Sequence, residues 1–216
     1  MSIANNLEKI KATLPDAVTL VAVSKTKPIA DLKEAYEVGQ RIFGENKIQE
    51  MTQKWEELPK DIQWHMIGHV QTNKVKYMAA YVNLIHGVDS FKLLKEINKQ
   101  AKKNNRIIDC LLQIHIAEED TKFGLDKEEL LSILESDTFK ALENIKIKGL
   151  MGMATFTDNE QQVRREFKSL KSLYDVATTK LTGLDTLSMG MSGDYHSAIE
   201  EGSTMVRIGS SIFGSR

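Results

Sequence analysis

Strand-like and helix-like segments alternate along the whole of this 216-residue chain, and this alternation limits the fold more than any other feature. Apolar, β-branched runs are typical of strands, and we expect eight of them, at residues 18–24, 41–45, 63–68, 82–88, 106–115, 145–153, 184–189 and 204–209. Eight strand–helix pairs without a Pro-, Gly- or Ser-rich linker predict an α/β fold, a single closed (β/α)8 TIM barrel over residues 1–216. An open doubly wound sheet is the alternative.

The clearest helical patterns lie at the start of the chain and towards its end. Apolar residues first recur at spacings of three and four, at Ile3, Leu7, Ile10 and Leu14. This spacing predicts an extra N-terminal amphipathic helix that Pro15 ends. A long helix is expected over 158–177, with Asp158 and Gln161 forming a capping box at its start. Ser90 is expected to cap the helix after the fourth strand.

Charge and cysteine content exclude several classes of protein. The chain has 29 Lys and Arg against 30 Asp and Glu, a formal net charge of −1, so no overall charge draws it to nucleic acid or to an acidic membrane. No run approaches the roughly 18 apolar residues of a membrane span, and the first residues lack the apolar stretch of a secretory signal. We therefore expect a cytoplasmic protein without nucleic-acid or membrane partners. Its single cysteine, Cys110, cannot form an intrachain disulfide, which suits a reducing compartment.

Lys25 follows the first predicted strand, in the segment SKTKP at 24–28. In a (β/α)8 barrel the chemistry gathers at the C-terminal ends of the strands, so Lys25 is expected at the barrel mouth. Partial burial among aliphatic side chains favours the neutral amine, the form that attacks a carbonyl group. On this residue alone, a solvent-exposed loop lysine is an equally good interpretation.

Glycine and serine follow the seventh and eighth predicted strands, in SMGMSGD at 188–194 and RIGSSIFG at 207–214. Such barrels often bind phosphate between the loops after these two strands and the start of a short extra helix. Gly209, Ser210 and Ser211 suit a phosphate cradle, because glycine lets the backbone approach an anion and serine hydroxyls donate hydrogen bonds. Ordinary turn chemistry is the alternative.

A lysine at the first strand and a phosphate cradle at the last two predict a ligand with both an aldehyde and a phosphate. Pyridoxal 5'-phosphate (PLP) carries both groups. Arg207, just before the cradle, is expected beside the pyridine nitrogen, where PLP enzymes use Asp or Arg. Because a guanidinium cannot accept a proton, this partner disfavours the protonated ring and weakens the ring as a sink for carbanion electrons.

Other polar side chains give weaker signals. His65 and His69 are four residues apart, but His65 lies in a predicted strand and no third ligand is evident, so we expect no metal site. Both histidines are interpreted as structural, although His65 can also contact a ligand ring. Asn46, after the second strand, is either a contact to a ligand hydroxyl or a helix cap. Ser192 has no Gly-x-Ser-x-Gly elbow and is not expected to be a nucleophile.

Six segments of the chain occur together in one known family. The chain resembles the pyridoxal phosphate homeostasis protein family along essentially its whole length, through VAVSKTKP (21–28), FGENKIQE (43–50), WHMIGHVQTNK (64–74), KFGL (122–125), GLMGMAT (149–155) and LSMGMSGDYHSAIEEGSTMVRIGSSIFG (187–214). The resemblance implies a barrel of PLP fold type III, like the N-terminal domain of alanine racemase.

The resemblance also implies a set of cofactor-binding residues and no catalytic residue. The set comprises Lys25, which would carry PLP as a Schiff base, Arg207 at the ring nitrogen, Asn46 at its side, and Ser192, Gly209 and Ser210 at the phosphate. Ser210 stands where many members have threonine, and it keeps the hydroxyl.

The function implied by the resemblance is vitamin B6 homeostasis in the cell, with indirect effects on amino-acid and keto-acid metabolism. The implied partners are PLP, other B6 vitamers and PLP-dependent apoenzymes, and we expect a monomer. After Phe213 we expect no C-terminal β-domain, and hence no second acid–base of a two-base racemase. The alternatives are a PLP-dependent racemase, decarboxylase or lyase with Lys25 as proton shuttle, and a colourless aldolase-type barrel.

Overall fold

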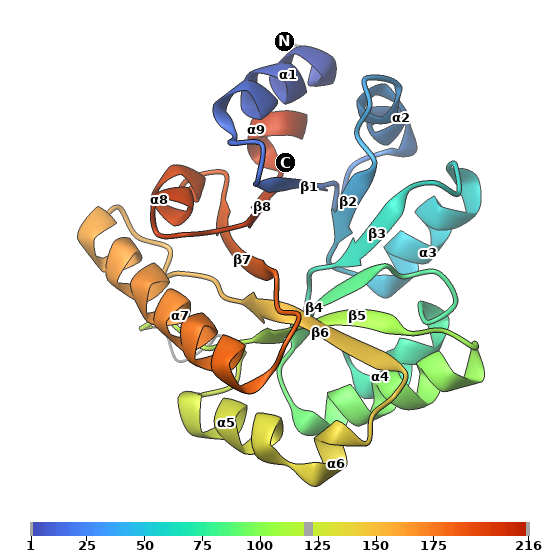
Figure 1. Ribbon diagram of the computed structural model, residues 1–216. Helices are drawn as coiled ribbons and strands as arrows, with labels where there is room; N and C mark the ends of the chain where they lie inside the picture. Colours follow the sequence, from blue (N-terminus) through green and yellow to red (C-terminus); the bar gives the residue numbers. More distant parts are fainter. Residues whose placement is uncertain (1, 119–122, 215–216) are drawn as a thin grey trace.

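The strands of the chain close into a barrel that helices surround on the outside (Figure 1). The computed structural model describes residues 2–118 and 123–214. The strands pair in chain order from β1 to β8, all parallel, and β8 pairs in turn with β1, where Val21 lies opposite Arg207. This last pairing confirms the predicted TIM barrel and excludes the open doubly wound sheet.

The bounds of the elements follow the predicted alternation. The strands are β1 Thr19–Val23, β2 Ile42–Glu45, β3 Gln63–Met66, β4 Leu84–Val88, β5 Ile108–Gln113, β6 Ile145–Met151, β7 Thr186–Met191 and β8 Met205–Ile208. The helices are α1 Ile3–Thr13, α2 Ile29–Glu37, α3 Ile48–Glu57, the 3-10 helix η1 Thr72–Tyr77, α4 Phe91–Lys103, α5 Lys127–Glu135, α6 Asp137–Lys140, α7 Glu160–Lys180, α8 Tyr195–Glu200 and α9 Ser210–Phe213.

The helix termini confirm two of the three predicted signals. Helix α1 ends just before Pro15, and the Ser90 hydroxyl accepts a hydrogen bond from the Leu93 amide at the start of α4. The predicted capping box of α7 is wrong by one residue. Asn159, not Asp158, is the N-cap, and its side chain accepts from the Gln162 amide at 3.2 Å. Asn and Asp cap helices about equally well, so composition alone does not choose between neighbours.

Side chains along each strand alternate between two environments because successive residues of a strand point to opposite faces. The outward residues pack against the helices in one large apolar cluster that includes Phe43 and Trp64. The inward residues form a smaller cluster that fills the barrel: Val21, Leu84, Leu111, Met151 and Met205. Four of the strands also carry buried polar residues that face inward, nearer the mouth: His65 on β3, His86 on β4, Ser188 on β7 and Arg207 on β8.

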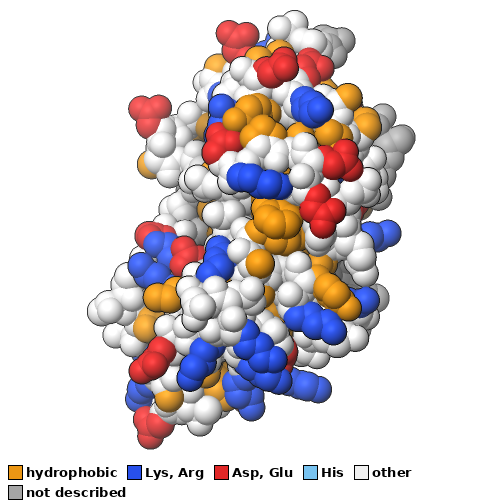
Figure 2. Space-filling model, turned by 90° about the vertical axis from the view of Figure 1, so that its right-hand side faces the viewer, with side chains coloured by type: hydrophobic (Ala, Val, Ile, Leu, Met, Phe, Trp, Pro, Cys, Tyr) orange, Lys and Arg blue, Asp and Glu red, His pale blue; other side chains and the backbone are white. Residues whose placement is uncertain are grey.

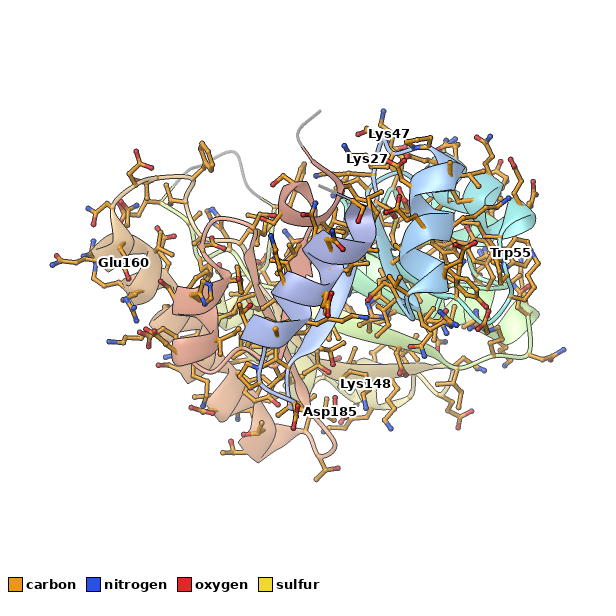
Figure 3. All side chains as sticks on the ribbon, turned by 90° about the horizontal axis from the view of Figure 1, so that it is seen from above. Lys27, Lys47, Trp55, Lys148, Glu160 and Asp185 are labelled. Atoms are coloured by element: carbon orange, nitrogen blue, oxygen red, sulfur yellow. The ribbon has the colours of Figure 1, made fainter. Side chains whose placement is uncertain are left out.

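The two ends of the barrel carry different parts of the chain, because all the strands run in the same direction. In Figure 3, Lys27 and Lys47, which follow β1 and β2, lie at one end, whereas Lys148 and Asp185 lie at the other. Helix α1 packs against α9 and α2 (Figure 1). The loops after the strands therefore share one end of the molecule, the barrel mouth.

The surface carries both signs of charge. Figure 2 shows the side of the molecule at the right of Figure 1, where acidic and basic side chains surround small hydrophobic areas. Within residues 2–118 and 123–214, no helix combines the length and the apolar character that crossing a bilayer requires.

Candidate functional site

Lys25 lies at the mouth of the barrel, directly beyond β1. The Ser24 amide donates to the Gly44 carbonyl at 3.0 Å, so pairing with β2 continues past the end of β1. Ser24 is on the outer face, where its hydroxyl donates to Glu45 Oε1 at 2.6 Å. Because faces alternate along a paired strand, Lys25 has the same inward parity as Val21. Its side chain is half-buried, as predicted for a lysine at the mouth.

The end of β8 packs directly against the end of β1. A Cβ atom at Gly209 would lie 3.1 Å from the carbonyl oxygen of Val23 and 3.2 Å from its Cβ. These distances are shorter than ordinary van der Waals contacts, so a side chain at this position would have to displace Val23 by a few tenths of an ångström. The glycine- and serine-rich segment therefore packs against Val23, which precedes Lys25 by two residues in the chain.

Ser192 and Ser210 flank Gly209. The Gly209 amide donates to the Ser192 hydroxyl at 3.2 Å, which joins the loop after β7 to the end of β8. Gly209 is also the N-cap of α9, and Ser210 is the first residue of that helix and is exposed. The hydroxyls of these two serines can each donate a hydrogen bond, which suits an anion.

Arg207 lies deeper, inside the barrel. Its guanidinium donates to the carbonyl and the hydroxyl of Ser188, at 2.9 and 2.6 Å, and to the Gly152 carbonyl at 3.1 Å. Burial lowers the pKa of Arg207 to about 10. This pKa is still well above neutral pH, so the side chain stays cationic at pH 7 and can donate to a ligand but cannot accept a proton from it.

Two buried histidines continue from Arg207 across the barrel. Ser188 Oγ lies 3.2 Å from His86 Nδ1, and His86 Nε2 lies 3.0 Å from His65 Nδ1. Ser188 Oγ, which accepts from Arg207, thus links the guanidinium to the two imidazole rings. Burial lowers the pKa of His65 to about 3 and that of His86 well below its usual value, so both rings are neutral.

His86 is a member of this chain of contacts that sequence reasoning missed. It lies in β4, on the same inward face as Leu84, and a single histidine in an apolar strand looks like any buried residue. The signal that could have found it is the alternation itself, since His65, His86 and Ser188 all have inward parity on their strands.

Asn46 and His69 are also placed by the structure. Helix α3 begins at Ile48 with Lys47 as its N-cap, so Asn46 is not the cap and is a half-buried residue at the end of β2. His69 lies in an exposed loop, where Nδ1 is 2.9 Å from Asp89 Oδ2 and the ring stacks on Phe123. Across the described part of the chain, no group of three or more His, Cys, Asp or Glu side chains could hold a metal ion.

A closed parallel barrel with a lysine after β1 and serine and glycine after β7 and β8 is the architecture of the alanine racemase N-terminal-domain class. The model of that family, described as alanine racemase, N-terminal domain, matches residues 1–216. An alanine racemase from Bartonella henselae has the same fold, with a TM-score of 0.76 at 17% identity, over 99% of this chain and 58% of that one.

The chain belongs to the pyridoxal phosphate homeostasis protein family. It is 42% identical over 199 residues to the pyridoxal phosphate homeostasis protein of Aquifex aeolicus, an alignment that covers 91% of this chain and 86% of that protein. The structure of PipY from Synechococcus elongatus PCC7942 with PLP bound is similar, with a TM-score of 0.90 at 33% identity, and covers 99% of this chain and 100% of that one.

These matches confirm the family inferred from the six sequence segments. One of those segments, KFGL, begins at Lys122, which lies outside the described residues.

Proposed function

We propose that this protein binds PLP through Lys25 and takes part in intracellular vitamin B6 homeostasis. The observation that carries this proposal is the contact between the ends of β1 and β8, where Gly209 packs on Val23. A lysine and a segment rich in serine and glycine at the same mouth suit a small ligand that carries an aldehyde and a phosphate. PipY, a relative of similar fold, is described with PLP bound.

The donor set at the mouth fits PLP. Ser192 and Ser210, on either side of Gly209, offer two hydroxyls to the phosphate, and the Gly209 amide holds Ser192 in place. Arg207 offers a cationic donor to the ring nitrogen, and Asn46 is within the loops of the same end. When bound, PLP supplies an aldehyde that condenses with a primary amine, and Lys25 provides that amine.

We propose that the protein carries PLP rather than catalysing a reaction with it, so that no residue has a catalytic role. Arg207 stays protonated inside the barrel, donates to Ser188 and Gly152, and accepts no proton. His65 and His86 are neutral and contact each other and Ser188, so neither ring carries the additional proton that an imidazolium could give to a ligand. The residues inside the barrel thus favour holding the cofactor over moving protons on it.

Reduction with borohydride followed by peptide mapping tests the proposal. The purified protein is expected to be yellow, and borohydride is expected to fix a phosphopyridoxyl group on Lys25. The Lys25→Ala variant is expected to lose both the colour and the adduct while its melting temperature stays within a few degrees. An adduct on another residue, or no adduct in the wild type, contradicts the proposal, and a colourless protein favours an aldolase-type barrel.

A turnover assay separates the carrier from a PLP-dependent racemase or lyase. With a panel of amino acids, we expect no racemisation or decarboxylation at ordinary enzymatic rates, which are about 1–10³ s⁻¹. Turnover at such rates that Lys25→Ala abolishes contradicts the carrier role.

We further propose that the protein acts in the cytoplasm as a monomer, binds other B6 vitamers, and delivers PLP to apoenzymes.

A further inference from the structure

A buried charged cluster lies outside the barrel, behind the segment that carries Lys25. Its centre is Lys54 on α3, which is only 4% exposed. Lys54 Nζ donates to the Ser24 carbonyl at 2.8 Å, to Glu45 Oε1 at 2.8 Å and to Glu50 Oε1 at 2.7 Å. These three acceptors match the three protons of an ammonium group, so Lys54 is fully bonded by its neighbours.

The same cluster holds the residues on both sides of Lys25. The Ser24 hydroxyl donates to Glu45 Oε1 at 2.6 Å, and the Ser24 carbonyl accepts from Lys54. On the other side, the Thr26 amide donates to Glu50 Oε1 at 2.6 Å. The residues on both sides of Lys25 are therefore bonded to this cluster through their main chains. Ser24 bonds directly to the Lys54 ammonium, and Thr26 bonds to it through the Glu50 carboxylate.

The turn after Lys25 needs such support. Thr26 has φ = 63°, in the left-handed region that a β-branched residue rarely adopts. Backbone in this region persists where the surroundings fix it, and it gathers at sites where geometry matters. Here the Glu50 carboxylate supplies the fixed contact at the Thr26 amide, and the Lys27 amide closes the turn on the Ser24 carbonyl at 3.0 Å.

Burial of this cluster is costly, which argues that it does more than fill space. Glu45 is fully buried and its Oε2 atom has no hydrogen-bond partner among the described residues. Burial raises the pKa of this carboxyl, although Lys54 opposes the shift. A buried ion pair is weak evidence for stability, since apolar residues of the same volume often stabilise as well or better. Apolar residues would not reproduce the hydrogen bonds that the cluster makes to Ser24 and Thr26.

We propose that Lys54, Glu45 and Glu50 are positioning residues for Lys25, which set the direction of its amine at the barrel mouth by fixing Ser24 and Thr26. This inference rests on the proposed function, in which Lys25 bonds covalently to PLP. The cluster acts on bond formation and not on docking of the phosphate, because its contacts are to the turn after β1 and not to the cradle after β8.

Glu50 is the member of the cluster that allows a clean test, because its side chain is 23% exposed. Lys54→Met would leave two carboxylates without their cation and is expected to lower the melting temperature sharply. Glu50→Ala removes the acceptor at the Thr26 amide and one of the three acceptors of Lys54, whereas Glu50→Gln keeps a carbonyl oxygen that can accept from both. Glu201→Ala is the matched control, because Glu201 is also a largely buried carboxylate, paired with Arg164 at 3.2 Å, and lies outside the turn.

The experiment uses two probes on the full chain. The rate of covalent bond formation is followed with PLP by absorbance and borohydride trapping, and docking alone is followed by the affinity for pyridoxine 5'-phosphate, which has an alcohol in place of the aldehyde. Misplacing a reacting group by about 1 Å can cost about 100-fold in rate. We expect Glu50→Ala to slow bond formation about tenfold or more, with pyridoxine 5'-phosphate affinity within twofold of the wild type, and Glu50→Gln to restore most of the rate.

Hydrogen exchange without any ligand gives an independent readout. The Thr26 amide is expected to exchange faster in Glu50→Ala than in the wild type, in Glu50→Gln or in Glu201→Ala. Equal rates of bond formation in wild type and Glu50→Ala overturn the positioning role, and so does an equal loss of rate and of pyridoxine 5'-phosphate affinity. If the wild type itself forms no bond at Lys25, the proposed function is wrong and this inference falls with it.

Discussion

Lys27 ties the segment that carries Lys25 to the last helix of the chain. Its ammonium donates to the Phe213 carbonyl at 3.0 Å and to the Gly214 carbonyl at 3.1 Å, at the C-terminal end of α9. A cation at a helix C-terminus satisfies carbonyls that have no partner within the helix. Lys27, two residues after Lys25, therefore stabilises the C-terminal end of α9, the helix that begins at Ser210.

Removing this tie should loosen the cradle. Lys27→Met is expected to speed hydrogen exchange over 209–214 and to weaken PLP binding a few-fold, because losing a hydrogen bond to a charged group costs about 1.5–3 kcal/mol and only part of this reaches the ligand. Lys47→Met is the control, since Lys47 is an exposed lysine at the same end of the barrel (Figure 3). Equal exchange in both variants would show that α9 does not depend on Lys27.

The role of Ser192 is separable by choice of ligand. Ser192→Ala removes a hydroxyl from the cradle and the acceptor of the Gly209 amide. We expect its affinity for PLP to fall about tenfold, as for one hydrogen bond to a charged group, and its affinity for pyridoxal, which lacks the phosphate, to stay the same. Titration calorimetry with both ligands measures this. An equal loss for the two ligands would place Ser192 away from the phosphate.

The buried histidine pair predicts a fall in stability on acidification. Burial lowers the pKa of folded His65 to about 3, while an unfolded histidine titrates near 6.5. Between pH 6.5 and pH 3, His65 therefore takes up a proton in the unfolded chain but not in the folded chain. The free energy of unfolding falls as the pH falls through this range. At pH 5 this loss is about 2 kcal/mol for His65.

Urea unfolding of wild type and His65→Gln at pH 8, 6 and 5 measures this dependence. The wild type is expected to lose more stability than the variant between pH 8 and pH 5. The difference between the two proteins at pH 8 serves as the control, since it reports the lost packing and the lost contact with His86 without any proton uptake. Parallel pH profiles would mean that His65 is protonated when folded.

Gly149 on β6 tests the packing of the barrel wall. A Cβ at Gly149 would lie 1.6 Å from the Thr186 carbonyl oxygen, and its φ is +159°. Gly183, with φ = +82°, has no atom within 4 Å of such a Cβ. Gly149→Ala is expected to lower the free energy of unfolding by about 4 kcal/mol or more, and Gly183→Ala by about 1–2 kcal/mol, from the left-handed backbone alone. Similar losses in chemical denaturation would show that β6 can shift away from β7.

The order of elements and part of the site follow from the sequence because they depend on local patterns. Each predicted strand overlaps an observed one, since β-branched runs between turn residues are local signals. Lys25 and Gly209 were placed at one end of the barrel by a rule about strand ends. The close approach of Gly209 to Val23 follows from barrel closure, which no local pattern in the sequence shows.

The residues that sequence reasoning missed act through partners far along the chain. Ser188 and His86 are 102 residues apart, and nothing in either segment indicates the other. Lys54 and Glu50 are four apart on α3 and look like an ordinary solvated pair, which is what such spacing usually means on a helix. Burial against Glu45 and Ser24 makes them different, and that burial is a property of the assembled barrel.

Because Val21 on β1 lies opposite Arg207 on β8, one of the two sides of the mouth beside Lys25 is open until the final strand has been added. While the ribosome is still making that strand, the nascent chain has its lysine but neither the guanidinium nor the cradle beside it. A ligand that needs both Lys25 and the segment after β8, as the proposed function requires, can therefore be bound only once the barrel has closed.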